Sequence, residues 1–228
     1  MLLRFPFGEF TFVETLLILL GYGLAIMLAL VVHEWAHAFA AYKSGDPTAK
    51  MLGRMTLNPA RHVEPMGLLS FIFIGIGWAK PVPVNPFNYR NFKRGNFFVS
   101  IAGVTTNFIM GFVFSLCFAL MISFAPIEIS RGLITGNPGL VALAYFFMFA
   151  TSINIALMIF NLLPIYPLDG YNLLRSFTKP TNRYMQFARD NSMILLIVVL
   201  LVSSFTGGIW HLHNAIMNMF TSLWGLMF

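Results

Sequence analysis

Long stretches without a charged residue dominate the chain. Four of them cover residues 15–32, 96–127, 132–168 and 191–228. A helix needs about 20 apolar residues to cross a bilayer, and each stretch is near or above that length. The pattern predicts an all-α polytopic membrane protein with about four to six transmembrane or re-entrant helices.

The boundaries of these stretches predict a single domain over residues 1–228. We expect spans at 11–42, 97–127, 139–168 and 191–206. The pair Gly207-Gly208 separates the fourth span from a tail, 209–228, which either lies in the membrane interface or crosses again. We expect no removable signal peptide, because acidic residues precede the first apolar run and no small-residue cleavage site follows it.

Residues 43–96 differ from the spans. The apolar stretch 67–79 has only 13 residues, which favours a re-entrant or interfacial segment. Residues 50–58 alternate apolar and polar side chains, which predicts a short strand. The prolines of 81–85 require an extended chain. We therefore expect a small membrane-associated β element between the first and second full spans.

Basic residues orient the chain. If 67–79 does not cross, 12 of the 14 Lys and Arg share one side, whereas a crossing would divide them nine against five. Basic loops face the cytoplasm, so the N-terminus is expected to be extracytoplasmic in the cell membrane.

Composition supports this membrane assignment. The chain is 58% hydrophobic and 10% charged, and its net charge of +6 fits cytoplasmic loops rather than nucleic-acid binding. The single Cys117 excludes an intrachain disulfide and a cysteine metal cluster.

The sequence His33-Glu34-Trp-Ala-His37 stands at the end of the first predicted span. Residues four apart share one helix face, so both imidazoles can bind one Zn²⁺, and Glu34 can reach its water as general base. The alternative is a set of helix-end polar residues satisfied by their neighbours. Ionisable groups inside a span are costly and usually functional, which favours the zinc site. The motif lies close to the charged Lys43, which would place that site on the cytoplasmic side.

A catalytic zinc needs a third protein ligand, and Asp169 is the acid in an apolar context. Pro164 and Pro167 break the helix before it, which frees the chain to turn the carboxylate inward. The topology places Asp169 at the same depth as the histidines. The alternative is an aspartate that caps an Asp-Gly bend.

Several motifs together resemble the site-2 protease family of intramembrane zinc metalloproteases, in its compact prokaryotic form without PDZ or CBS domains. They are HExxH, Gly53-Arg-Met-Thr-Leu-Asn-Pro59 with His62-Val-Glu-Pro-Met-Gly67, Gly77-Trp-Ala-Lys-Pro-Val-Pro-Val-Asn85, Ala102-Gly-Val-Thr-Thr-Asn107 and the stretch 161–170. One departure is Val104-Thr105-Thr106, which replaces the usual proline and small residues.

The resemblance implies His33, His37 and Asp169 as ligands of one Zn²⁺, with Glu34 as general base. It also implies that Asn161 lies near the scissile carbonyl, although an interhelical hydrogen bond, for example with Asn154, is an equal alternative. The segment around 50–58 then becomes a substrate-binding edge, which adds these expected substrate-binding residues: Gly53, Arg54, Met55, Thr56 and Asn107. For Asn107, helix packing is the plainer alternative.

The implied activity is regulated intramembrane proteolysis. Its expected substrates are single-pass membrane proteins within the lipid bilayer, such as anti-sigma factors or signal-peptide remnants. Two other classes stay open at this point: a metal transporter, in which the same ligands bind ions transiently, and a non-catalytic protein that binds client helices.

Overall fold

The computed structural model describes residues 5–74, 77–130, 132–179 and 181–225. Its helices run in the order η2 (Phe7–Glu9), α1 (Phe12–Ser44), α2 (Thr48–Met51), η3 (Pro59–Arg61), α3 (Pro65–Ile74), η4 (Pro86–Asn88), α4 (Phe92–Phe124), α5 (Pro138–Asn161), α6 (Asp169–Arg175), α7 (Arg183–Asp190), α8 (Ser192–Thr206) and α9 (Gly208–Gly225). Strands β1 (Ile127–Ser130) and β2 (Leu133–Gly136) form an antiparallel hairpin between α4 and α5. The expected helical membrane fold with a small β element is confirmed.

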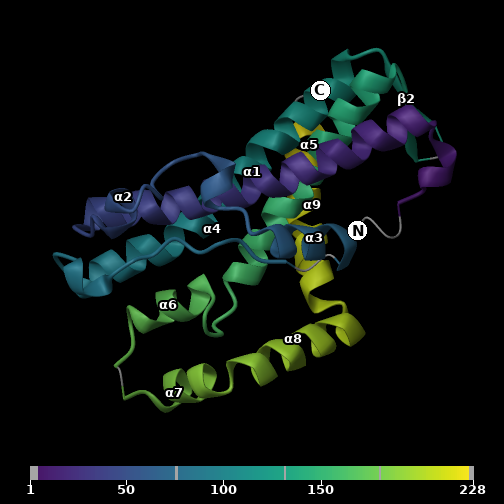
Figure 1. The fold of residues 1–228 in the computed structure, drawn as a ribbon. Coiled ribbons are helices and arrows are strands. Elements are labelled where there is room, and N and C mark those ends of the chain that lie inside the picture. The colour runs from purple at the N-terminus through teal and green to yellow at the C-terminus, as the bar shows by residue number, and fades with distance from the viewer. Residues whose placement is uncertain (1–4, 75–76, 131, 180, 226–228) are drawn as a thin grey trace.

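Three long helices form the centre of the molecule. Helices α1, α4 and α5 each pack on the other two (Figure 1). Within the described residues, these three are long and apolar enough to cross a membrane, and the pair α7 and α8, bent by 86°, gives up to a fourth span. They overlap the first three predicted spans, but α5 ends at Asn161, whereas the predicted span extends to residue 168. The chain is therefore a multi-pass membrane protein.

Local sequence signals set the helix ends. Thr11 and Glu14 form a reciprocal capping box at the start of α1, and Gly45, with φ of 111°, ends that helix. Asn137 caps α5, where Pro138 takes the first helical position. The ends of α1 place His33 and His37 in the C-terminal half of that helix.

The predicted strand at residues 50–58 is wrong. The segment contains the end of α2, followed by Gly53 with φ of +66° and a series of bends. A left-handed glycine interrupts an extended chain, and the hydrogen bond from His62 Nε2 to the Thr56 carbonyl, 2.7 Å, holds the segment in a loop. The observed hairpin lies instead after α4, so this part of the expected position is also corrected.

The tail packs against the helices rather than standing apart. Phe220 of α9 is fully buried in a cluster with Val104, Ile155 and Ile159 of α4 and α5. Helix α8, by contrast, has no buried residue, as expected for a lipid-facing helix. Helix α9 therefore belongs to the central bundle, and it joins α8 through Gly207, with φ of +69°.

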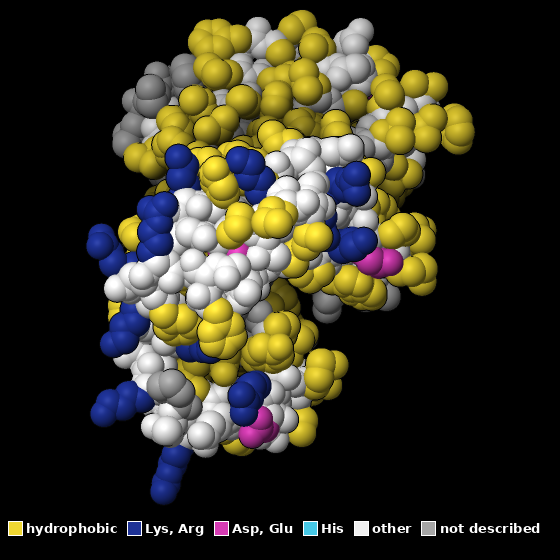
Figure 2. Space-filling model, turned by 60° about the vertical axis from the view of Figure 1, so that its left-hand side comes forward, with side chains coloured by type: hydrophobic (Ala, Val, Ile, Leu, Met, Phe, Trp, Pro, Cys, Tyr) yellow, Lys and Arg dark blue, Asp and Glu magenta, His cyan; other side chains and the backbone are white. Residues whose placement is uncertain are grey.

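Basic residues gather at one end of the molecule. Figure 2 shows Lys and Arg side chains over the lower part of the face, below an upper part that is largely hydrophobic. Exposed members of this group lie at the end of α1, on α2, around the start of α4 and on α7: Lys43, Lys50, Arg90, Lys93, Arg94, Arg183 and Arg189. This end holds the loops to which the sequence assigned most of the positive charge.

Candidate metal centre

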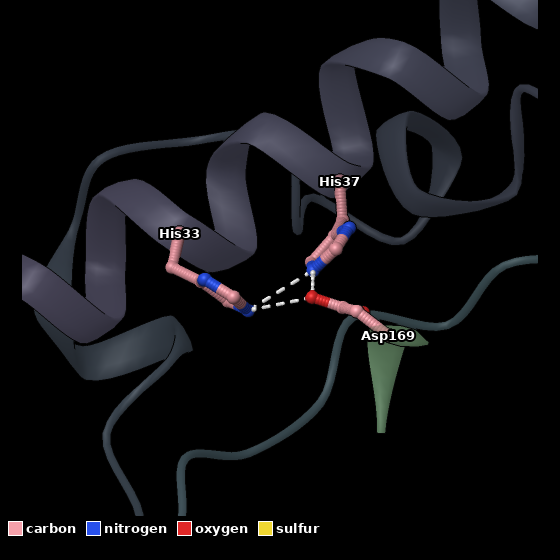
Figure 3. Close-up of side chains that lie close together, drawn as sticks. All are labelled: His33, His37 and Asp169. Atoms are coloured by element: carbon pink, nitrogen blue, oxygen red, sulfur yellow. Dashed lines mark hydrogen bonds and ion pairs between the residues drawn. The ribbon is translucent and has the colours of Figure 1, made fainter. Parts of the chain in front are cut away.

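Two histidines of α1 face the interior of the bundle. His33 and His37 are 6% and 9% exposed, and their Nε2 atoms lie 3.0 Å apart. Spacing of four residues places them on one helix face, one turn above each other. Helix α1 thus presents two imidazole nitrogens at a single point (Figure 3).

Asp169 approaches the same point from a different segment. Helix α5 ends at Asn161, the prolines interrupt the helix, and Asp169 begins α6. Its Oδ2 lies 3.4 Å from His33 Nε2 and 3.2 Å from His37 Nε2. In the described chain these are the three His, Cys, Asp or Glu residues whose ligand atoms converge closely enough to hold a metal ion.

Helix α4 closes the other side of the imidazole pair. A Cβ at Gly103 would lie 2.5 Å from both His33 Cε1 and His37 Nε2, so glycine permits this approach. The Nδ1 of His37 lies 2.7 Å from the carbonyl oxygen of Val99, and the Nδ1 of His33 lies 2.5 Å from Oδ1 of Asn107. Helix α4 therefore holds both imidazoles through Nδ1, the ring nitrogen that does not face Asp169.

The donor set fits zinc. A carbonyl only accepts, so His37 donates from Nδ1 and leaves a lone pair on Nε2. The buried Oδ2 of Asp169 has no hydrogen-bond partner in the described structure. The ligand atoms are separated by 3.0, 3.2 and 3.4 Å. Tetrahedral zinc with bonds near 2.0–2.1 Å requires ligand atoms about 3.3 Å apart, and such sites use two His and one carboxylate.

Glu34 is held by an extended segment of the main chain. Its Oε2 accepts a 2.8 Å hydrogen bond from the backbone N–H of Val82. The flanking Pro81 and Pro83 have no N–H, so Val82 supplies the donor at this place. We call residues 80–88 the strap, because they run from this contact to the end of α1.

Two charged side chains fasten the strap. Arg54 donates from Nη2 to the carbonyls of Lys80 and Pro81, at 2.8 and 3.1 Å. Buried Asp46 accepts from the N–H of Asn85 at 2.6 Å and from Nδ2 of Asn88 at 2.7 Å.

The same hydrogen bonds set the acidity of Asp46. Burial by itself raises the pKa of this carboxyl, but hydrogen bonds from Thr48, Asn85 and Asn88 outweigh it and hold the pKa below its ordinary value. Next to the strap, burial raises the pKa of Tyr89 to about 12. Asp46 is therefore charged, and Tyr89 neutral, at neutral pH.

Comparison with known proteins gives the same chemistry. The family model described as Peptidase family M50 matches residues 22–205. That range contains the converging ligands and Glu34. The chain belongs to peptidase family M50.

Curated relatives of this M50 chain bear names of the same kind. It is 34% identical over 193 residues to "Putative zinc metalloprotease YwhC" of Bacillus subtilis (strain 168), with 84% of this chain and 85% of that protein covered. It is 29% identical over 188 residues to "Putative zinc metalloprotease Rip2" of Mycobacterium tuberculosis (strain ATCC 25618 / H37Rv). There the coverage is 79% of this chain and 66% of that protein. No solved structure matches the chain. The M50 chain is thus a zinc metalloprotease with membrane helices.

The residues expected to bind substrate lie around the strap. Gly53 ends the turn after α2, and Arg54 reaches the strap carbonyls. Met55 packs against Ala38, Ala49 and Val82, and the carbonyl of Thr56 accepts from His62. Their role in substrate binding stays a prediction, although it no longer rests on a strand edge.

Two asparagines lie at different distances from the centre of the bundle. Asn107 is 1% exposed and contacts His33 directly. Asn161 is half-buried, and its Nδ2 donates to the carbonyl of Leu157 at 3.0 Å, one turn before it. The predicted contacts of both residues with substrate stay predictions.

Sequence reasoning missed the Val82 N–H, the Val99 carbonyl and the role of Asn154, which it named only as a candidate interhelical partner of Asn161 although both asparagines lie on α5. The first two are main-chain atoms, which no side-chain motif reveals. Asn154 is fully buried and hydrogen-bonded to Asn107. A signal for it existed, because a buried amide in the middle of an apolar span requires a partner.

Proposed function

We propose that this M50 metalloprotease hydrolyses a peptide bond within or near the transmembrane helix of single-pass membrane proteins, as in regulated intramembrane proteolysis. The observation that carries the proposal is the position of the histidines on α1. This helix has 33 residues and contains a strongly apolar window, yet it carries two of the three converging ligands. A protease of soluble substrates has no reason to keep its ligands in a membrane helix.

The described residues divide the chemistry among them. His33, His37 and Asp169 would hold one Zn²⁺, which when bound would supply Lewis-acid activation of a water molecule and of the scissile carbonyl. Glu34 takes the proton of the attacking water and delivers it to the leaving nitrogen. The Val82 N–H keeps this carboxylate oriented.

Asn161 is suited to the developing oxyanion. Its amide nitrogen has two hydrogens, and the Leu157 carbonyl takes one of them. The second hydrogen is the donor that we assign to the substrate carbonyl. Removal of such a donor costs about 10²- to 10³-fold in kcat.

The distribution of basic residues supports an orientation. Because the exposed Lys and Arg gather beyond the end of α1, we assign that end to the cytoplasm of the cell membrane, with the N-terminus outside. His37 precedes Lys43 by six residues, or about 9 Å along the helix. The reaction would take place at a shallow depth on the cytoplasmic side.

Substrate helices must unwind before cleavage, because helical hydrogen bonds and side chains shield their peptide bonds. We expect single-pass proteins already shortened on their outer side, with anti-sigma factors and signal-peptide remnants as candidate classes. The family assignment favours hydrolysis over metal transport or client binding.

The test is cleavage of a tagged single-pass helix, shortened on its outer side, by purified protein in lipid vesicles. Wild type should cleave it, and Glu34→Gln should lose at least about 10²-fold in rate while it retains zinc. Zinc content measured on both proteins separates loss of the base from loss of the metal. Cleavage by Glu34→Gln at the wild-type rate would overturn the role of Glu34. Failure of wild type on a panel of such helices would overturn the proposed substrate class.

A further inference from the structure

A line of hydrogen bonds connects three helices to His33. Asn154 of α5 donates from Nδ2 to the carbonyl of Ala150 at 2.8 Å. Its Oδ1 accepts from Nδ2 of Asn107, on α4, at 2.8 Å. The Oδ1 of Asn107 lies 2.5 Å from Nδ1 of His33 on α1.

The direction of every bond in this line follows from its first member. The Ala150 carbonyl only accepts, so the amide nitrogen of Asn154 must face it, and Oδ1 faces Asn107. Asn107 must then present its nitrogen to Asn154 and its oxygen to His33. His33 is left as the donor at Nδ1, which leaves the lone pair of Nε2 for a metal.

The two histidines differ in how this lone pair is secured. His37 donates directly to the main-chain carbonyl of Val99, whose role cannot be reversed. His33 instead contacts the side-chain amide of Asn107. Rotation of that amide by half a turn would present its NH₂ group to His33 in place of its oxygen. With the NH₂ group facing it, His33 would accept at Nδ1 and carry its hydrogen on Nε2, where it blocks the metal.

Burial leaves the amide groups of Asn154 and Asn107 few alternative hydrogen-bond partners. Asn154 is 0% exposed and Asn107 is 1% exposed, so water does not compete for their amide groups. Gly111 of α4 lies against Asn154, where an added Cβ would be 3.5 Å from Asn154 Cβ. A buried amide is tolerated only when its groups are hydrogen-bonded, so an inverted Asn107 would have no stable place while Asn154 is present.

We propose that Asn154 is a positioning residue that acts through Asn107 to hold His33 in its metal-binding tautomer. The inference rests on the metal role of His33 and deepens the proposed function. Asn154 itself does not touch the metal ligands in this line; it determines which face of Asn107 they meet. Outer partners of metal-bound histidines typically affect affinity or activity by 10- to 100-fold.

The first test is zinc affinity, measured by competition with a chelator on the full-length protein. Asn154→Leu keeps a similar volume and removes both hydrogen bonds, so affinity should fall about 10- to 100-fold. The matched control is Thr151→Val on α5: Thr151 is equally buried, but its hydroxyl donates only to the Phe147 carbonyl of its own helix. The control should bind zinc within about twofold of wild type. If Asn154→Leu does not fold, Asn154→Ala takes its place.

The second test is rescue by Asn107→Asp. Both oxygens of a carboxylate accept, so Asp at position 107 keeps His33 as an Nδ1 donor whichever way it is turned. In Asn154→Leu/Asn107→Asp, zinc affinity should therefore recover at least tenfold over Asn154→Leu alone. The spectrum of Co²⁺ bound in place of zinc should return to that of wild type.

Two results would overturn the inference. One is wild-type zinc affinity in Asn154→Leu. The other is an equal loss with and without Asn107→Asp, which would mean that Asn154 acts only through packing. Because these measurements need no substrate, they stay separate from the proposed function: an enzyme that shows the predicted affinities but cleaves no membrane helix would overturn that function alone.

Discussion

The bundle holds the two histidines and the strap holds Glu34, and they do so by different means. Around His33 and His37, the bundle relies on shape: Gly103 lets α4 approach, and main-chain and amide groups contact the imidazoles. Around Glu34, the strap has little regular structure and is fastened by the charged residues Arg54 and Asp46. Substitutions in the bundle should act through steric clashes and have abrupt effects. Substitutions in the strap should have graded effects that depend on charge.

Gly103→Val should give the largest effect. An added side chain would collide with both imidazoles, so zinc binding should be lost, and overpacking should cost about 1–3 kcal/mol of stability. Zinc content and thermal unfolding in detergent measure the two effects. The control is Gly111→Ala on the same helix, where the added Cβ meets atoms no closer than 3.5 Å. Full zinc occupancy in Gly103→Val would refute the steric description.

Asp46→Ala should come next, with a loss of about 2–3 kcal/mol, because it removes the buried, charged acceptor of the hydrogen bonds from half-buried Asn85 and exposed Asn88. The pKa of Asp46 is lowered in the folded protein, so its contribution is full above the ordinary Asp pKa near 4 and is lost as pH falls through the lowered value. The difference in unfolding free energy between wild type and variant should be smaller at pH 3 than at pH 7. Asp190→Asn, at an exposed residue paired with Arg189, should change stability by less than about 0.5 kcal/mol.

Arg54→Gln should give the smallest effect. The strap would lose the hydrogen bonds to the carbonyls of Lys80 and Pro81, which together contribute about 1 kcal/mol, or about fivefold in cleavage rate. Zinc content should not change, because Arg54 contacts none of the ligands. Arg61→Gln, at an exposed residue, is the control. Loss of zinc in Arg54→Gln would show that strap and bundle are not separable.

The bundle was largely predictable and the strap was not. Apolar length located the long helices, HExxH picked out two residues of the converging cluster, and the isolation of Asp169 in an apolar stretch picked out the third. The strand at 50–58 failed because its alternation did not separate inside from outside. Met51 and Leu57, on its apolar side, are 79% and 56% exposed.

Asn154 shows a different limit of prediction. Its partner depends on the rotation and depth of α5 relative to α4, which a single sequence does not encode in any local pattern. On α4, buried Gly103, Asn107 and Gly111 follow each other at a spacing of four. Small and polar residues at that spacing mark a helix face that packs closely on its neighbours. The face was readable in the sequence, but its partners were not.

The Pro-Val-Pro-Val run has a consequence for register. If the strap slid by one residue in either direction, Pro81 or Pro83 would stand opposite Glu34, and neither has a hydrogen to donate. Only one alignment of the strap therefore gives the Glu34 carboxylate a hydrogen-bond donor. The positions of the two prolines in the sequence determine that alignment. An alanine scan would report only the packing of the Val82 side chain, since alanine keeps the main-chain N–H, although the atom that orients the base belongs to this position.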